Sequence, residues 1–255
     1  MPTALVTGAT AGLGAEFARQ LAASGHDLVL VARDAERLSS VQQELAAQWG
    51  VHVEVIGADL TSDTDCAAVV GRIADPNRPL DVLVNNAGSG MYTPFGTRPI
   101  EDEEYQLDLN VRAVLRLTHA AVRSMTERNS GRIVNVSSVA IFVPRGSSAT
   151  YSASKAYVSQ FSEALAVHLH TSPVSVTAVH PGFTRTEFHQ RAHKDMSRVP
   201  ERMWLTPEEV VREGLADAMK GKPLSVPTRQ YRTRLRMLRL VPRPVLRRVL
   251  GRRAR

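Results

Sequence analysis

Strand-like and helix-like segments alternate along most of this chain, with short connections between them. Most strand-like segments are short runs rich in Val, Ile and Leu, as expected for strands covered by helices on both faces. This alternation predicts a parallel sheet with right-handed crossovers, that is, a doubly wound α/β fold. The predicted strands are Ala4–Thr7, Leu28–Ala32, Val51–Ile56, Val82–Asn85, Arg132–Ser137 and Val174–His180. The predicted helices cover residues 12–24, 35–49, 63–74, 101–126 and 151–170.

Charge divides the chain into two parts. Residues 229–255 contain eleven arginines and no acidic residue, whereas residues 1–228 hold the other 21 Lys and Arg residues against 25 Asp and Glu. We therefore predict one α/β domain over residues 1–228 and a basic tail over residues 229–255. A single cysteine, Cys66, fits a reducing compartment, and a signal peptide or membrane-spanning run is not evident, so we expect a cytoplasmic protein.

A glycine-rich loop follows the first predicted strand. It reads Thr7-Gly8-Ala9-Thr10-Ala11-Gly12-Leu13-Gly14 and leads into an amphipathic helix. Glycines here allow a tight turn and let the backbone approach a pyrophosphate at the positive end of the helix. A purely structural turn is the alternative, but the position between the first strand and the first helix favours dinucleotide binding.

The first 193 residues contain a single lysine, Lys155, and it lies four residues after Tyr151. On a helix these two residues share one face, so the ammonium can lie near the phenol. A cation there would favour the phenolate and lower the tyrosine pKa from its usual value of about 10. The pair therefore predicts a proton-transfer site, although a helix-surface pair without chemistry is the common alternative.

Five spaced motifs together resemble the short-chain dehydrogenase/reductase family. The loop has the spacing Thr-Gly-x-x-x-Gly-x-Gly, and Tyr151 and Lys155 follow Ser138 by thirteen and seventeen residues. The resemblance covers about residues 3–228. The remaining motif residues are Asn85-Asn86-Ala87-Gly88 after the fourth strand, Asn110 in the next helix, Ser137-Ser138 at the end of the fifth strand, and Pro181-Gly182 after the sixth.

The resemblance implies an NAD(P)-dependent oxidoreductase that interconverts a carbonyl and its alcohol. Tyr151 would donate the proton, Ser138 would bind the carbonyl oxygen, Lys155 would tune the phenol and bind the nicotinamide ribose, and Asn110 would hold a water. Ser137 is the competitor of Ser138, and the family spacing favours Ser138. No metal is expected. The cofactor-binding residues implied are Thr7, Gly8, Thr10, Gly12, Leu13, Gly14, Arg33, Asp59, Leu60, Asn86, Ala87, Gly88, Tyr151, Lys155, Pro181, Gly182 and Thr184.

The end of the second strand favours NADP(H) over NAD(H). NAD-selective enzymes typically place a carboxylate there, whereas this chain has Ala32 followed by Arg33. A small residue leaves room for a 2′-phosphate, and a guanidinium is suited to pair with it. Thr10 could add a hydroxyl donor. Asp34 keeps NAD(H) possible, and its alternative role is to cap the following helix. Asp59 likewise either contacts the adenine or caps a helix.

Three segments are expected to shape the substrate pocket, by the same resemblance: residues 89–95, 139–148 and 183–205. Their mixture of aromatic and basic residues suggests a mostly apolar substrate with one polar end. We expect a ketone or aldehyde on a lipid-like molecule of the 3-oxoacyl or steroid type. The substrate-contacting candidates are Ser138, Tyr151, Met91, Phe142 and Phe183.

The basic tail predicts two short amphipathic helices. The apolar residues of the first are Tyr231, Leu235, Leu238 and Val241; the second opens at Pro244 and contains Val245, Leu246, Val249 and Leu250. Peripheral contact with an anionic membrane, docking on its own domain or on a partner subunit, and disorder all remain open, and nucleic acid is an unlikely partner. A catalytically silent NADP-binding scaffold acting at membranes is the alternative function. Homo-oligomer formation is implied by the family resemblance.

Overall fold

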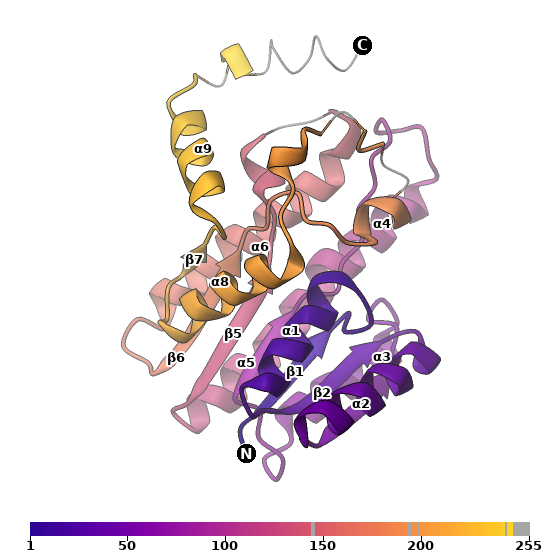
Figure 1. Ribbon diagram of the computed structural model, residues 1–255, viewed down its shortest axis with the longest axis vertical. Helices are drawn as coiled ribbons and strands as arrows, with labels where there is room; N and C mark the ends of the chain where they lie inside the picture. The colour runs from indigo at the N-terminus through magenta and orange to yellow at the C-terminus, as the bar shows by residue number, and fades with distance from the viewer. Residues whose placement is uncertain (144–145, 193–194, 198, 243, 247–255) are drawn as a thin grey trace.

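The computed structural model describes residues 1–143, 146–192, 195–197, 199–242 and 244–246 (Figure 1). In this part of the chain, seven parallel strands form one sheet with the order β3-β2-β1-β4-β5-β6-β7. The doubly wound α/β fold is thus confirmed. The strands are β1 Thr3–Thr7, β2 Asp27–Ala32, β3 Val53–Gly57, β4 Val82–Asn85, β5 Gly131–Val136, β6 Val174–Val179 and β7 Leu224–Ser225.

Helices cover both faces of the sheet and bury two apolar cores. One core joins α1 (Gly12–Ala23), α2 (Ala35–Trp49) and α8 (Pro207–Met219) to the sheet. The other joins α3 (Asp63–Ala74), α5 (Ala113–Glu127) and the end of α6 (Ala149–His168) to the opposite face, and it contains the buried Cys66. Both faces of the strands are covered, which is why their sequences are apolar runs without alternation.

Shorter helices lie between these elements or after them, namely α4 Ile100–Leu107, α7 Phe188–Arg191 and α9 Arg229–Arg239. Single turns of 3₁₀-helix occupy Val139–Phe142, Gly146–Ser148 and Glu201–Met203. None of the helices in the described residues is long and apolar enough to cross a membrane.

The expected helix over residues 101–126 is interrupted. A π-helical turn at Asp108–Arg112 separates α4 from α5 and contains the fully buried Asn110. Asn110 Oδ1 accepts a hydrogen bond from Ser89 N at 2.9 Å. Asn110 Nδ2 donates to the Ser89 carbonyl at 2.9 Å and to Ser154 Oγ at 3.1 Å. These partners come from distant segments, so the sequence of the helix does not reveal the interruption. Strand ends also differ from expectation by up to two residues, and β7 and α8 were not among the predicted elements.

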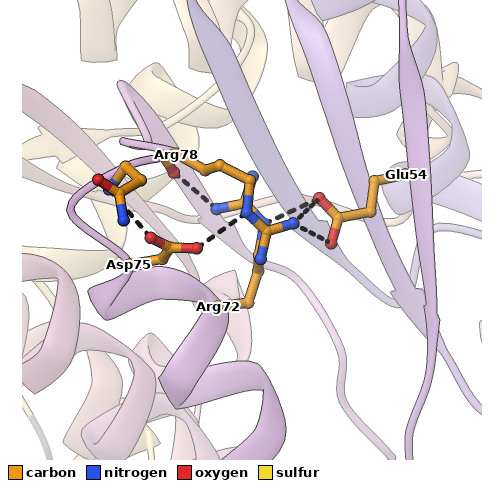
Figure 2. A network of polar contacts seen from close by, with 5 residues as sticks. Glu54, Arg72, Asp75 and Arg78 are labelled. Atoms are coloured by element: carbon orange, nitrogen blue, oxygen red, sulfur yellow. Dashed lines mark hydrogen bonds and ion pairs between the residues drawn. The ribbon is translucent and has the colours of Figure 1, made fainter.

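A polar network joins β3 to the end of α3 (Figure 2). Arg72 is almost entirely buried, and its Nε donates to Glu54 Oε2 at 2.8 Å while its Nη1 donates to the Arg78 carbonyl at 2.7 Å. Arg78 in turn pairs with Asp75 at 2.8 Å. A buried guanidinium is tolerated when it is paired and hydrogen-bonded in this way. This network lies away from the cavity described below.

The order of the strands places the first crevice of the sheet beside β1. The chain runs from β1 outward to β2 and β3 and then returns to β4 on the other side of β1. In open α/β sheets, ligands bind at this switch point, beyond the carboxyl ends of the strands. The glycine-rich loop leaves β1 at that end.

Candidate active site

A single continuous cavity of about 1030 Å³ follows the carboxyl ends of the strands. The loops after β1, β2 and β3 line one part of it, and the loops after β4, β5 and β6 line the rest. Side chains of α6, α7 and α9 complete the wall. The predicted cofactor loop and the predicted catalytic tyrosine therefore open into the same space.

The glycine-rich loop leaves the start of α1 free to receive an anion. Gly8 and Gly12 adopt φ of +66° and +55°, a conformation that side chains other than glycine rarely adopt. A Cβ on Gly14 would collide with the Gly8 carbonyl and the Asn86 amide, so only glycine allows this close approach. Ala11 at the N-cap provides no side-chain cap, and the first turn of α1 has no acidic residue. Unpaired N–H groups and the helix dipole thus fit a pyrophosphate.

Thr7 braces this loop from behind rather than lining the cavity. Its hydroxyl is buried, donates to the Val84 carbonyl at 3.3 Å, and accepts from the backbone N–H groups of Asn86 and Ala87 at 3.0 Å each. The Asn86 amide donates back to the Thr7 carbonyl at 2.9 Å. These bonds hold the ends of β1 and β4 together, so the two loops keep a fixed separation.

Arg33 lines the cavity beyond β2. Its Nη1 donates to Tyr105 Oη at 2.7 Å, and it forms no ion pair with a described residue. Asp34 also lines the cavity, and its side chain caps α2 by accepting from Arg37 N at 3.0 Å, the alternative role that the sequence left open. A guanidinium without a carboxylate partner, next to the small Ala32, fits a 2′-phosphate. Asp59 also lines the cavity and binds Thr61 N and Oγ1.

Tyr151 and Ser138 lie together in the cavity wall. Burial raises the pKa of the Tyr151 phenol, and hydrogen bonds with Ser138 and Tyr92 offset part of that rise. Ser138 Oγ also accepts from Ala140 N at 3.1 Å, which fixes the start of the following 3₁₀ turn. Ser137, the competing serine, donates its hydroxyl to the Lys155 carbonyl at 2.8 Å. The arrangement leaves Tyr151 and Ser138 as hydroxyls that can bind the same oxygen atom.

Lys155 is buried one helical turn beyond Tyr151. Its Nζ donates to the Val136 carbonyl at 2.9 Å, and burial lowers its pKa to about 8. Gly88 faces it closely: a Cβ there would lie 3.2 Å from Lys155 Nζ and 3.0 Å from Asn110 Oδ1. The expected lowering of the Tyr151 pKa by Lys155 is not found, because desolvation dominates at the phenol and the ammonium is directed to a backbone carbonyl.

Seventeen predicted site residues line the cavity, and five do not. The lining residues are Gly8, Thr10, Gly12, Leu13, Arg33, Asp59, Leu60, Asn86, Ala87, Gly88, Ser138, Tyr151, Lys155, Pro181, Gly182, Phe183 and Thr184. Thr7, Gly14 and Asn110 lie behind the wall and support it. Met91 and Phe142, expected to contact the substrate, are not among the lining residues; the Phe142 ring packs 5.8 Å from His180. Residues 144–145, 193–194 and 198 of the predicted pocket segments lie outside the described residues.

The wall beyond Tyr151 is aromatic. The rings of Tyr92 and Phe188 lie 5.6 and 5.9 Å from that of Tyr151. His189 continues the row, 5.6 Å from Phe188 and 6.1 Å from Phe183. This part of the cavity therefore offers an apolar surface next to the two hydroxyls.

The first helix of the basic tail docks on the site. Tyr231 is 3% exposed, and its hydroxyl accepts from Phe183 N at 3.0 Å and donates to the Met203 carbonyl at 2.8 Å. Its ring packs on Gly182, where a Cβ would collide with it. Leu235 and Leu238, from the same face of α9, line the cavity. The helical spacing of the tail identified this apolar face but not the surface that it covers.

Most described residues of the tail that follow this docked face are exposed to solvent. Beyond the docked face of α9, Met237, Leu240, Val241 and Val245 are exposed, and in Figure 1 the end of α9 projects away from the layers. Residues 244–246 are helical, as the second predicted tail helix requires at its start. Val249 and Leu250 lie outside the described residues.

Comparison with known proteins gives consistent matches. A family model for short chain dehydrogenases matches residues 2–197, which include every motif named above. The NADP-dependent 3-hydroxy acid dehydrogenase of Salmonella typhi is 34% identical over 213 residues, covering 81% of this chain and 84% of that protein. Sulfoacetaldehyde reductase 2 of Chromohalobacter salexigens is 36% identical over 186 residues, covering 72% of this chain and 73% of that protein. A solved short-chain dehydrogenase from Sphingobium yanoikuyae in complex with NADPH has a TM-score of 0.85 and 34% identity, covering 95% of this chain and 97% of that chain.

Proposed function

Because this chain belongs to the short-chain dehydrogenase/reductase family and is an NADP-dependent oxidoreductase of alcohols and carbonyls, we propose that it acts on a mostly apolar ketone or aldehyde, with Tyr151 as the general acid and base. One observation carries the assignment of Tyr151. Its phenol and the Ser138 hydroxyl share the wall of a cavity that also holds the glycine-rich loop and Arg33. A carbonyl bound there can therefore meet both a proton donor and the cofactor.

The cavity residues fit NADP(H). Gly8, Gly12 and Leu13 would hold the pyrophosphate at the start of α1, Arg33 would bind the 2′-phosphate, and Lys155 would bind the nicotinamide ribose. When bound, the cofactor supplies or accepts the hydride. The protein is left with binding, orientation and movement of the proton.

Proton movement would depend on three side chains. Tyr151 would give its phenolic proton to the oxygen of the reduced carbonyl, and Ser138 would donate a hydrogen bond to the same oxygen and stabilise its negative charge. In the free protein burial holds the pKa of Tyr151 above its usual value, so the phenol is protonated and ready to act as an acid at neutral pH. Asn110 would act as a positioning residue, because it fixes the backbone of Ser89 beside Gly88 and Lys155.

The walls support an apolar substrate. The same cavity that holds the predicted catalytic hydroxyls is lined by Phe183, Phe188, Met203, Leu235 and Leu238. A lipid-like carbonyl compound would bury its chain against them. The relatives named for a 3-hydroxy acid and for sulfoacetaldehyde make a compact acid the alternative substrate.

Turnover across a substrate panel tests this function. We expect NADPH oxidation with apolar ketones or aldehydes, much faster than NADH oxidation at the same concentrations. Tyr151→Phe should bind NADPH normally and lose at least about 100-fold in kcat, because the proton donor is removed while the ring remains. Tight NADPH binding without turnover of any compound would instead favour the alternative, a catalytically silent scaffold.

Two further expectations about partners have unequal support. The chain's family commonly forms oligomers, and Tyr157 and Val167 of α6 are exposed apolar residues available for such an interface. Peripheral membrane contact through residues 229–255 stays a prediction with less support. It requires the apolar face of α9 to be free, whereas Tyr231 and Leu235 of that face are buried against the domain.

A further inference from the structure

Among the residues that the structure describes, three arginines line the cavity, and they differ in their partners. Arg191 is paired with Glu187 at 2.5 Å. Arg33 binds the Tyr105 hydroxyl at the end of the cavity assigned above to the 2′-phosphate. Arg234, on α9, forms neither an ion pair nor a hydrogen bond through Nη1 with any described residue. Its charge is therefore the one among these three that neither a carboxylate nor the 2′-phosphate of the expected cofactor accounts for.

The fold holds Arg234 in this position. Its guanidinium lies 5.5 Å from the ring centre of Tyr231, which the Phe183 amide and the Met203 carbonyl fix in place. A cation over an aromatic face is attracted to it. Nη1 is nonetheless buried without an acceptor, and burying a charged donor without one is unfavourable. A small rotation of the guanidinium towards the cavity would let an acceptor on a bound molecule remove that cost.

Arg234 lies apart from the 2′-phosphate end of the cavity. A row of contacts leads to it from Tyr151 through Phe188, His189 and Phe183 to Tyr231. Arg33 follows β2, whereas the loop under Tyr231 follows β6, four strands away in the sheet. At the usual spacing between strands this separation is roughly 19 Å. One cofactor phosphate at Arg33 therefore cannot also satisfy Arg234.

We propose that Arg234 binds a carboxylate on the substrate, at the end remote from the carbonyl that reacts beside Tyr151. The planar guanidinium suits a carboxylate, and the aromatic and aliphatic wall between the two sites suits the carbon chain that joins them. This inference rests on the proposed function and gives the substrate class as an oxo acid with an apolar chain. It also gives the docked tail helix a role in choosing the substrate.

Paired substrates test the proposal. Oxodecanoic acids with the ketone at different carbons are compared with their methyl esters, using NADPH and the full chain. For at least one position of the ketone, the wild type should prefer the acid by about tenfold to a hundredfold in kcat/KM, the effect of a hydrogen bond between charged groups. Arg234→Gln should remove this preference, so that the ratio of kcat/KM for the acid to that for the ester falls to about one. Arg236→Gln, which removes the same charge from an exposed position of α9, should keep it.

Binding without chemistry separates this proposal from the proposed function. Calorimetry of the NADPH-loaded protein should show that decanoate binds the wild type and Arg236→Gln, and binds Arg234→Gln at least about tenfold more weakly. Equal preference for acids and esters in the wild type, or equal decanoate affinity in both variants, overturns the role of Arg234. Absence of turnover with every carbonyl compound, while decanoate still binds through Arg234, overturns the proposed function alone.

Discussion

Folding buries the side chain of Lys155. Only 4% of the residue's surface stays exposed, and its ammonium donates a hydrogen bond to the Val136 carbonyl. Burial lowers its pKa from the usual 10.5 to about 8. The unfolded chain therefore binds more protons than the folded protein between these two values. Below about pH 8 the full cost of the buried charge opposes folding, and the cost disappears as the pH approaches 10.5.

The variant Lys155→Met isolates this cost. It keeps the length of the side chain and removes the titrating group, so the stability of the wild type relative to the variant should increase with pH. The rise should be about 3 kcal/mol between about pH 8 and 10.5, at 1.36 kcal/mol per pKa unit. Urea unfolding at a series of pH values measures it, without cofactor. Other groups titrate in both proteins and cancel in the difference, and a difference that is constant with pH would contradict the buried charge.

At the scale of elements, α9 shows how a segment with a tail-like sequence becomes part of a site. Five of its eleven residues are arginine, yet its Tyr231 and Leu235 are 3% and 8% exposed. Arg232 pairs with Glu213 of α8 at 2.9 Å, which holds the helix to the domain on another side. The helix therefore closes the cavity through its buried apolar residues, the hydrogen bonds of the Tyr231 hydroxyl and the ion pair between Arg232 and Glu213.

The Tyr231 hydroxyl should control how firmly α9 is held. Tyr231→Phe leaves the Phe183 N–H and the Met203 carbonyl without their partner, at a cost of about 1–3 kcal/mol for each group left unsatisfied. We expect faster amide exchange in residues 229–239 and a higher KM for the substrate, with a smaller effect on the α/β core. Tyr157→Phe removes a hydroxyl from a half-exposed position of α6 and should change neither quantity. Unchanged exchange in the Tyr231 variant would show that the hydroxyl does not anchor the helix.

For the molecule as a whole, an uncovered apolar stripe remains on α6. Tyr157, Phe161, Ala164 and Val167 recur at helical spacing and are exposed or partly exposed, with the first two rings stacked at 5.5 Å. Val167 is 73% exposed. An apolar stripe of this kind marks a protein interface, and it lies on the opposite side of the sheet from α8. It is the surface on which we expect two copies of the chain to pair.

Val167→Asp should therefore weaken the oligomer. A charge in the centre of a paired apolar face is left desolvated and without a partner, so the measured mass should fall towards that of the monomer. Light scattering after size-exclusion chromatography measures this change. Met219→Asp places the same charge on an exposed apolar residue of α8 and should leave the mass unchanged. A wild type that is already monomeric, or a Val167 variant of unchanged mass, would rule out this interface.

The sequence by itself determined the α/β layers and the loops at the ends of the strands. Both depend on local patterns: apolar runs become covered strands, and Gly8, Gly12 and Gly14 permit a backbone path that few other residues allow. Once the strands are parallel, their carboxyl ends meet at one edge of the sheet, so spaced motifs such as Ser138 and Tyr151 reach the same cavity.

Only the tertiary structure decided which side chains form the rest of the wall. Met91 and Phe142 are not in it although their segments are near, whereas Tyr231 and Arg234 enter it from the far end of the chain. The π turn around Asn110 has the same origin, since its amide is held by Ser89 and Ser154. Such contacts join residues distant in sequence, and no local propensity or spacing encodes the direction in which an irregular loop or a docked helix presents its side chains.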